Sequence, residues 1–247
     1  MHEYVLYSQI PDERIDTAVQ VLAGYTRSQP VYLGEQTIIY AQVKLPEAVV
    51  SRKHGQPKQL HLNNPRPIYE KLKRSLTTAQ QDGGPPEPLN DDWIFRVEQT
   101  PDPAVEATKP GSGKTMHISR DVLERPATDK DMDRFQEPEW YKYRHQYTLS
   151  GHQFVAGNIV IRVYRFHEEE YAGNPINRDL FVPTESNLID QSGAWVVEAV
   201  VRVEDPSITK IMDAAKRELA HFRVAMEGAL DLYAPDRLTL DTRVRDI

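Results

Sequence analysis

Three stretches in the second half of the chain decide the fold: WYKYRHQYTL at residues 140–149, NIVIRVYRF at 158–166 and AWVVEAVVRV at 194–203. All three are dense in β-branched and aromatic residues, which suit the pleated surface of a sheet. The first two are joined by SGHQFVAG at 150–157, whose terminal glycines can adopt the positive φ that a chain reversal needs. The sequence therefore predicts an antiparallel hairpin with a further strand beside it.

Composition narrows the class of protein. A chain of 247 residues can bury a sizeable core, and all-β barrels of this size often run as one domain, so we expect a single domain over 1–247. The 30 Lys and Arg against 37 Asp and Glu give a formal charge of −7, which disfavours a duplex-binding surface built on phosphate contacts. The sequence has no cysteine, and this excludes disulfides, thiolate catalysis and cysteine-ligated zinc.

The sequence contains no recognisable targeting signal, and this bears on where the protein is expected to be found. The first residues lack the charged and apolar regions of a signal peptide, and no apolar run approaches the length that spans a bilayer. The absence of cysteine suits a reducing compartment. We therefore expect a soluble, intracellular protein with no membrane partner.

The first part of the chain reads as strand, helix and strand. Residues 3–10 (EYVLYSQI) alternate as a strand would. A helix follows from Pro11, which suits a first helical turn, to Gly24, which can supply a left-handed C-cap. The next strand is expected at 37–45 (TIIYAQVKL), whereas residues 68–76 fit either a helix or a strand.

The middle of the chain is rich in proline and poor in apolar residues. Such sequence buries too little apolar surface to offset the entropy of ordering it, so we expect Pro/Gly-rich flexible insertions at about 77–92, 99–115 and 124–139. Two apolar islands, WIFRV at 93–97 and MHISRDVL at 116–123, are expected to be strands of the same sheet.

A long helix is predicted at 207–232, with Asp205 as N-cap and Pro206 at the first position. One face carries a nearly unbroken apolar stripe that must be buried. The stripe consists of Ile208, Met212, Ala215, Leu219, Phe222, Met226 and Leu230. Beyond Pro235, RLTLDTRV at 237–244 alternates as a terminal strand that pairs with an early one and closes the sheet.

Two motifs that suggest a ligand site are better explained without one. KPGSGKT at 109–115 ends like a phosphate-binding P-loop, but Thr108 stands where the pattern needs glycine and no buried strand precedes it, so we read it as linker. His145, His152 and His167 lie around the predicted hairpin, but their spacing is not that of a helical histidine pair, so no metal site is expected.

The polar faces of the predicted strands allow two interpretations. They could point into the lumen of a closed barrel and hold a polyanion such as a triphosphate, with carboxylates binding Mg²⁺ and arginines binding phosphate. They could equally face water outside a barrel whose apolar side is covered or filled, which is the ordinary arrangement for an antiparallel sheet and the one we expect. The rows are Arg162 and Tyr164; Glu198 and Arg202; and Lys142, Arg144 and Gln146.

No nucleophile can be assigned. Serine, histidine and aspartate all occur, but the chain has no Gly-x-Ser-x-Gly elbow and no spacing that gives these residues roles. We therefore predict no catalytic, cofactor-binding or metal-binding residues, and no cofactor.

The two ends of the chain carry a family resemblance. HEYVLYSQIP at 2–11 and RLTLDTRV at 237–244, together with the late order of strands and helix, resemble the fungal form of the Mediator subunit 18 family. The likeness covers most of the chain outside the Pro-rich middle. It implies a mainly β (α+β) fold, a multistranded antiparallel β-barrel with flanking helices, similar to the triphosphate-tunnel barrel of RNA triphosphatases.

The same resemblance implies a function and partners. It implies a non-enzymatic, nuclear subunit of the Mediator head module, a coactivator assembly for RNA polymerase II, acting as a protein-binding scaffold. The expected partners are Mediator subunit 20 as a heterodimer, the C-terminal helix of Mediator subunit 8, other head-module subunits and the RNA polymerase II machinery. Direct nucleic-acid binding is not expected, given the acidic charge balance.

The alternative is a diverged triphosphate-tunnel phosphohydrolase acting on RNA 5′ ends. Those enzymes carry Glu-x-Glu-x-Lys on a strand near the N-terminus, whereas the first predicted strand here offers only Glu3. Two other Glu-x-Glu pairs, at 137/139 and 168/170, are not followed by the lysine. We therefore favour the scaffold, with an apolar groove beside the 207–232 helix as a hypothetical docking site for a partner helix.

Overall fold

The computed structural model describes residues 1–43, 68–77, 88, 92–102, 117–168, 176 and 183–243. Within these ranges the chain forms eight β-strands, all paired antiparallel. The strands are β1 (His2–Ile10), β2 (Val31–Gln42), β3 (Tyr69–Ser75), β4 (Ile94–Glu98), β5 (Ile118–Pro126), β6 (Tyr141–Ala156), β7 (Ile159–Glu168) and β8 (Trp195–Val203). Every strand predicted before the C-terminal one is present, with shifted ends, and residues 68–76 supply a strand.

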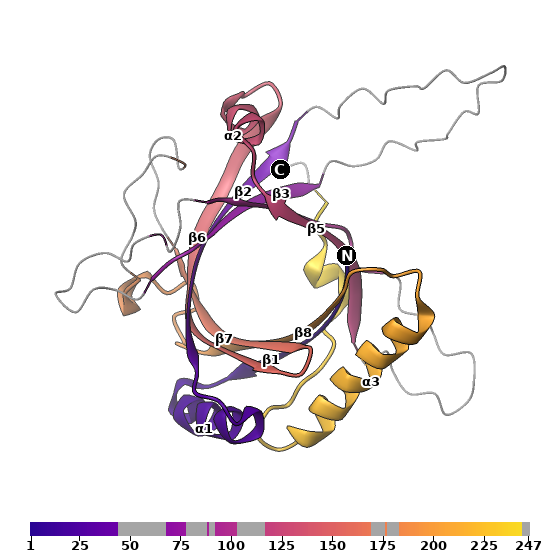
Figure 1. Cartoon of the computed structure of the whole chain (residues 1–247). Helices are drawn as coiled ribbons and strands as arrows, with labels where there is room; N and C mark the ends of the chain where they lie inside the picture. The colour runs from indigo at the N-terminus through magenta and orange to yellow at the C-terminus, as the bar shows by residue number, and fades with distance from the viewer. Residues whose placement is uncertain are drawn as a thin grey trace.

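The strands close into a barrel in the order β1-β5-β4-β3-β2-β6-β7-β8, with β8 paired back to β1. Figure 1 looks along this barrel and shows the strands as a ring with the helices outside it. The closing pair is long, running from His2 opposite Val203 to Ile10 opposite Trp195. The expected antiparallel barrel with flanking helices is confirmed.

The predicted hairpin has a shorter turn than its glycines suggested. Residues 150–156 are not a loop, because β6 continues to Ala156, which pairs with Ile159. Only Gly157 and Asn158 form the turn, and Gly157 has the positive φ of 61° that a two-residue hairpin favours at glycine. Gly151 lies inside β6, where an added Cβ would stand 2.0 Å from the carbonyl oxygen of Val163. Gly151 therefore serves close strand approach, not reversal.

The first helix differs from its prediction at both ends. A short 3-10 helix, η1 (Asp12–Arg14), precedes α1 (Ile15–Thr26). Gly24 does not cap the helix, because α1 continues for two more residues and Arg27 takes the left-handed conformation with φ 55°. The Thr26 hydroxyl donates a 2.8 Å hydrogen bond to the Leu22 carbonyl and so keeps the last turn helical.

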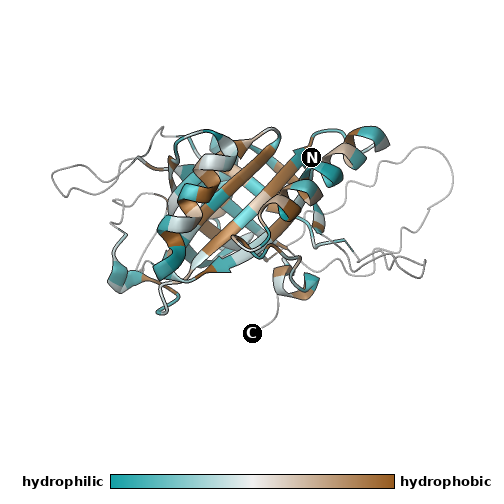
Figure 2. Ribbon diagram, turned by 90° about the horizontal axis from the view of Figure 1, so that it is seen from below, coloured by the Kyte–Doolittle hydropathy of each residue, from teal (hydrophilic) through white to brown (hydrophobic). Residues whose placement is uncertain are grey.

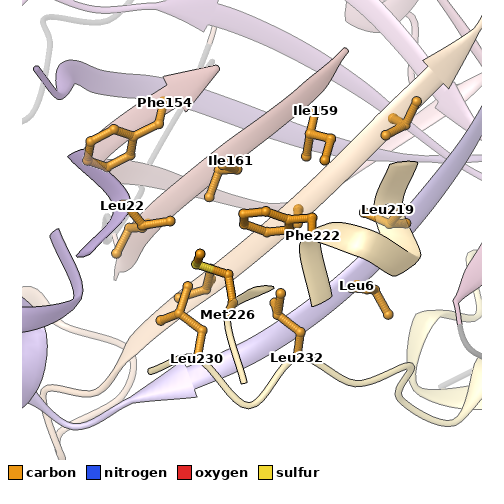
Figure 3. Close-up of a cluster of buried hydrophobic side chains, with 14 of the residues drawn as sticks. Leu6, Leu22, Phe154, Ile159, Ile161, Leu219, Phe222, Met226, Leu230 and Leu232 are labelled. Atoms are coloured by element: carbon orange, nitrogen blue, oxygen red, sulfur yellow. The ribbon is translucent and has the colours of Figure 1, made fainter. Parts of the chain in front are cut away.

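The largest apolar core lies outside the barrel, between its wall and the helices α1 and α3 (Thr209–Ala225). Figure 3 shows Phe222 of α3 against Ile161 of β7, with Leu22 of α1 nearby. Phe222, Ile161 and Leu22 are completely buried. From Met212 onward, the predicted apolar stripe of the late helix thus packs against the outer wall of β1, β7 and β8, whereas Ile208, its first member, stays exposed.

Helix α3 is shorter than the predicted helix at 207–232. Asp205 does not cap it but accepts hydrogen bonds from the backbone and hydroxyl of Ser207, which form a turn before the helix. The helix ends at Ala225, and Gly228 takes a left-handed φ of 83° well before Pro235. Met226 and Leu230 lie beyond the helix but remain buried in the same core.

The prediction of a flexible insertion at 124–139 is wrong, since β5 extends to Pro126 and α2 (Asp129–Gln136) follows. A capping box starts this helix: Thr128 accepts from the Asp131 amide, and Asp131 accepts from the Thr128 amide. Phe135 then packs on Tyr40 and Tyr141, with ring centroids 4.5 and 4.6 Å away. Local capping and one aromatic anchor order a segment whose composition resembles a loop.

The predicted terminal strand at 237–244 is also wrong. Asp236 accepts from the Leu238 amide and starts a 3-10 helix, η4 (Arg237–Leu240). The segment from Leu232 to Arg243, here called the C-terminal strap, joins β1 at Tyr233 and reaches the start of β3 through a bridge from Arg243 to Ile68. In Figure 1 its 3-10 helix lies at one side of the ring.

Figure 2 shows apolar bands along the strands and polar residues on the outer faces of the helices. Among the described residues, no helix has both the length and the apolar character needed to cross a membrane. Most of the insertions predicted at 77–92 and 99–115, and the P-loop-like stretch at 109–115, lie outside the described residues.

Candidate functional site: the charged lumen of the barrel

The polar faces of the strands point into the barrel and not to the solvent outside it. Arg162 and Tyr164 of β7 and Glu198 and Arg202 of β8 line a lumen cavity of about 300 Å³. The expectation that these rows face water was wrong, because α1 and α3 cover the outer apolar faces and leave the polar faces for the lumen. The third row behaves differently: Lys142, Arg144 and Gln146 do not line this cavity.

Most of the charged side chains in the lumen come from strands for which the sequence predicted no polar row. Among the described residues, six cationic side chains line the cavity: Lys71, Lys73, Arg96, Arg120, Arg162 and Arg202. Four carboxylates of the same lining face them, Glu3, Glu35, Glu98 and Glu198, and Glu124 contacts Arg96 beside the cavity. Alternation in IFRVE at 94–98 was the available signal for Arg96 and Glu98, but their partners come from other strands, with Lys71 27 residues from Glu98 and Glu3 93 residues from Arg96.

Arg96 is the centre of the tightest part of this network. Its guanidinium donates from Nη2 to both oxygens of Glu3 at 3.1 Å, from Nε to Glu98 at 2.7 Å, and from Nη1 to Glu124. Arg120 donates from Nε to Glu3 at 2.7 Å and lies 3.0 Å from Glu98 through Nη1. Glu3, Arg96 and Arg120 are nearly inaccessible to solvent.

The two lysines of β3 neutralise one carboxylate each. Lys71 Nζ lies 2.8 Å from Glu98, and Lys73 Nζ lies 2.8 Å from Glu35. Because β3 alternates, both lysines point inward while Leu72 between them is fully buried in the outer core. The alternation of a single strand thus serves both sides of the wall.

The network holds its groups in their charged forms. Burial alone would raise the pKa of Glu98, but Lys71, Arg120 and Arg96 bring that pKa well below its usual value. The pKa of Glu3 is lowered in the same way, because Arg96 and Arg120 outweigh its burial. Lys73 is the exception, because burial and the neighbouring Arg96 and Arg162 lower its pKa despite the opposing effect of Glu35. The carboxylates are therefore occupied as partners of buried cations.

Arg162 is the loosely held cation of the lumen. Its Nη1 lies 3.9 Å from Glu198 and 4.0 Å from Glu35, which are ion-pair distances too long for hydrogen bonds. Both carboxylates have nearer donors, since Tyr7 donates to Glu198 at 3.2 Å and Lys73 lies 2.8 Å from Glu35. The Nε atom of Arg162 is buried without a hydrogen-bond partner in the described part of the chain.

An apolar cluster and the C-terminal strap complete the lumen. Leu33, Leu149 and Tyr164 are buried together, with Phe166 packed beside them. Leu240 of the strap also lines the cavity. The lumen therefore combines a charged middle with an apolar border.

The three histidines around the hairpin do not meet. His152 stacks on Trp195 on the outer wall, and the His167 ring hydrogen-bonds to the Ser150 hydroxyl at 2.7 Å. His145 lies beside Tyr147. Across the described ranges, no group of three or more His, Asp or Glu side chains could hold a metal ion.

Comparison with known proteins gives the family. The model of the Med18 protein family matches residues 2–243, nearly the whole chain. The chain belongs to this family. Similar curated relatives are the Mediator of RNA polymerase II transcription subunit 18 of Yarrowia lipolytica, 23% identical, and that of Aspergillus oryzae, 22% identical; each alignment covers 99% of this chain and 100% of the relative.

A solved structure shares the fold of this Med18-family chain. It is a chain in the structure of the Schizosaccharomyces pombe Mediator head module, with a TM-score of 0.65 and 16% identity. The match covers 95% of this chain and 99% of that one.

The outer wall of this Med18-family barrel leaves the apolar stripe of α3 covered. Leu219 and Phe222 are buried against the barrel, so the basis for a docking groove along this stripe is removed. Three apolar residues at the two ends of α3 stay accessible: Ile208 is 43% exposed, Ile211 46% and Val224 69%. Any partner that touches α3 meets these ends and its polar outer face.

Proposed function

We propose that this chain is a structural subunit of the Mediator head module and acts as a protein-binding scaffold in RNA polymerase II transcription. The match of residues 2–243 to the Med18 protein family carries this proposal. It is supported by relatives named as Mediator subunit 18 that align from end to end, and by a similar fold within a solved Mediator head module. A nuclear location follows from this role.

The proposed partners are Mediator subunit 20 as a heterodimer, the C-terminal helix of Mediator subunit 8, other head-module subunits and the polymerase machinery. The closed barrel supports this assignment, because closure pairs the strands with one another and leaves the outer wall and helices as the binding surface. The net charge of −7 supports binding to proteins more than to a nucleic-acid duplex.

We also propose that the protein works without catalysis. The lumen is where a tunnel phosphohydrolase would hold metal and triphosphate, and its carboxylates are engaged otherwise. Glu3 and Glu98 each bind two or more cations of the protein, and Glu35 binds Lys73. A carboxylate with its oxygens bound by arginine and lysine has little capacity left for Mg²⁺.

Co-expression with subunit 20 and the C-terminal helix of subunit 8, followed by native mass spectrometry, tests the scaffold role. We expect a stoichiometric complex, with an unrelated helix of the same length and charge as control. Recovery of free monomer alone would contradict the proposal. A phosphate-release assay with triphosphate-ended RNA and Mg²⁺ or Mn²⁺ tests the second claim, and turnover abolished by Glu98→Gln would contradict it.

A further inference from the structure

Another cavity lies outside the barrel, between α2 and the outer wall. Its lining includes Glu70 of β3, Phe95 of β4 and Tyr141 of β6, together with residues of α2. The volume is about 150 Å³, which corresponds to roughly five waters at about 30 Å³ each. The cavity therefore has room for one side chain and is too small for a helix.

Glu70 is a buried carboxyl without a cation. Because Lys71 and Lys73 line the lumen, alternation along β3 turns Glu70 to the outer face, where it is 8% exposed. It accepts a 2.8 Å hydrogen bond from the Tyr141 hydroxyl and has no ion pair within the described ranges. Burial raises the pKa of Glu70, whereas the pKa of Glu98 is lowered by its cationic partners.

The two arginines of this cavity do not neutralise Glu70. Arg125 is bound to Asp131 by two hydrogen bonds of 2.6 and 2.8 Å. Arg134 is exposed, and its guanidinium carbon lies 5.6 Å from the centre of the Tyr141 ring. A buried carboxylate that lacks a cation is costly, so the cavity favours the entry of a positive charge.

Aromatic rings form the walls of the cavity. The ring centre of Phe135 lies 4.6 Å from that of Tyr141 and 6.1 Å from that of Phe95. Such rings pack along the apolar stem of a long basic side chain and attract its charged end. Two ring faces already attract cations, since Arg125 lies 4.5 Å from the centre of Phe95 and Arg134 lies over Tyr141.

We propose that this cavity, here called the Glu70 pocket, receives a lysine or arginine side chain of a partner protein, with Glu70 as its ion-pair partner. The incoming group supplies the cation that Glu70 lacks, as Lys71 does for Glu98 at 2.8 Å in the lumen. One side chain fills the pocket, so the rest of the partner lies on the outer wall around it. This inference rests on the proposed scaffold role, which supplies the partner.

An NMR titration of the full chain at low ionic strength tests the pocket, with N-acetyl-lysine methylamide as the probe. The ring signals of ¹³C-labelled tyrosine report binding, and Tyr141→Phe assigns the signal of Tyr141. We expect a saturable shift of this signal. The affinity should be at least about tenfold weaker in Glu70→Gln, the loss expected for one charge-assisted hydrogen bond. Glu204→Gln removes an exposed carboxylate outside the pocket and should leave the affinity unchanged.

A neutral probe and a stability measurement separate binding from folding. N-acetyl-norleucine methylamide carries the same apolar stem without the ammonium group and should bind at least about tenfold more weakly. Glu70→Gln keeps an acceptor for the Tyr141 hydroxyl and removes a buried charge, so its melting temperature should equal or exceed that of the wild-type chain. A lower melting temperature would assign Glu70 to the fold and overturn the proposal.

A second variant acts in the opposite direction. Arg134→Gln removes the exposed cation beside the pocket and should strengthen binding of the lysine probe by at least about twofold. Absence of binding, equal affinity for the neutral probe, or equal affinity in Glu70→Gln would overturn the proposal. A titration that fails while co-expression yields the complex overturns the pocket alone. Co-expression that yields no complex while the titration succeeds overturns the scaffold role and the protein partner, and keeps the cation site.

Discussion

Replacement of Arg96 by methionine removes a buried side chain that contacts three lumen carboxylates at once, Glu3, Glu98 and Glu124. Methionine is unbranched and uncharged and replaces the aliphatic part of the arginine side chain, so the change removes the guanidinium and keeps most of the apolar packing. Loss of one partner from a buried ion pair costs about 3–5 kcal/mol, because it leaves buried charge uncompensated.

The structure places the expected loss near the lower end of that range. Each carboxylate keeps another cation: Arg120 stays 2.7 Å from Glu3, Lys71 stays 2.8 Å from Glu98, and Arg202 stays near Glu124. We therefore expect the free energy of unfolding to fall by about 3 kcal/mol, which is roughly a hundredfold in the unfolding equilibrium. Against a total of about 5–15 kcal/mol for a folded domain, this is a large fraction.

Urea unfolding monitored by tryptophan fluorescence measures the loss. With a slope of about 3 kcal/mol/M, the midpoint should fall by about 1 M at unchanged slope. Arg217→Met, an exposed arginine on α3, is the matched control and should change stability by no more than about 0.5 kcal/mol. A loss below about 1 kcal/mol for Arg96→Met would refute the reasoning, because it would mean that the lumen solvates its charges as the outer surface does.

A double substitution separates lost charge pairing from lost packing. Arg96 and Glu3 share two hydrogen bonds of 3.1 Å, so the two single changes should not be additive. In the Arg96→Met background, Glu3→Gln should cost at least about 1 kcal/mol less than it does in the wild-type chain. Strict additivity would show that the contact between Arg96 and Glu3 adds nothing to stability.

Three further predictions concern the barrel wall, the outer core and the charged lumen. Gly151→Ala places a methyl group against the carbonyl of Val163 and should prevent folding, so the yield of soluble chain should fall to a small fraction of the wild-type yield, and an unchanged yield would contradict this. Gly24→Ala in α1 meets no atom within 4 Å and should stabilise the chain by about 0.5–1 kcal/mol in thermal unfolding. Phe222→Ala should destabilise by about 3–5 kcal/mol, lowering the melting temperature by roughly 10 °C in calorimetry, and a shift below about 3 °C would contradict the burial of this ring. The pKa of Glu98 is lowered in the folded chain, so the ionised carboxylate stabilises the fold fully above the ordinary carboxyl pKa of 4.5, and this stabilisation is lost as the pH falls below it. The urea midpoint should therefore fall less steeply between pH 6 and pH 3 in Glu98→Gln than in the wild-type chain. Equal slopes of midpoint against pH would refute this.

The strands were predictable from sequence, but the side of the wall that each face occupies was not. Arg162 and Tyr164 alternate with Ile161 and Val163 in the same way whether the polar face meets solvent or a lumen. The choice depends on α1 and α3, whose apolar faces need the outer wall. These helices are distant in sequence from the strands that they cover, so the alternation within one strand cannot show which of its faces they bury.

The candidate site was missed for a related reason. Glu3 lies 93 residues from Arg96 and 117 residues from Arg120 along the chain, and closure of the barrel brings it to them. The sequence presented each as an isolated charge on an alternating strand. Two glycines were also assigned the wrong role. Gly151 was predicted to lie in a turn but permits the close approach of two strands, and Gly24 was predicted to cap a helix but lies within it.

The charged lumen has a structural consequence that fits a scaffold. A one-residue slip of β4 would carry Arg96 and Glu98 into the outer apolar core and bring Phe95 and Val97 against the lumen charges. Both moves leave buried charge without a partner, so the network penalises every odd change in register more strongly than an apolar filling would. A barrel fixed in this way holds its outer wall in one geometry, and the proposed binding surfaces on that wall require this constancy.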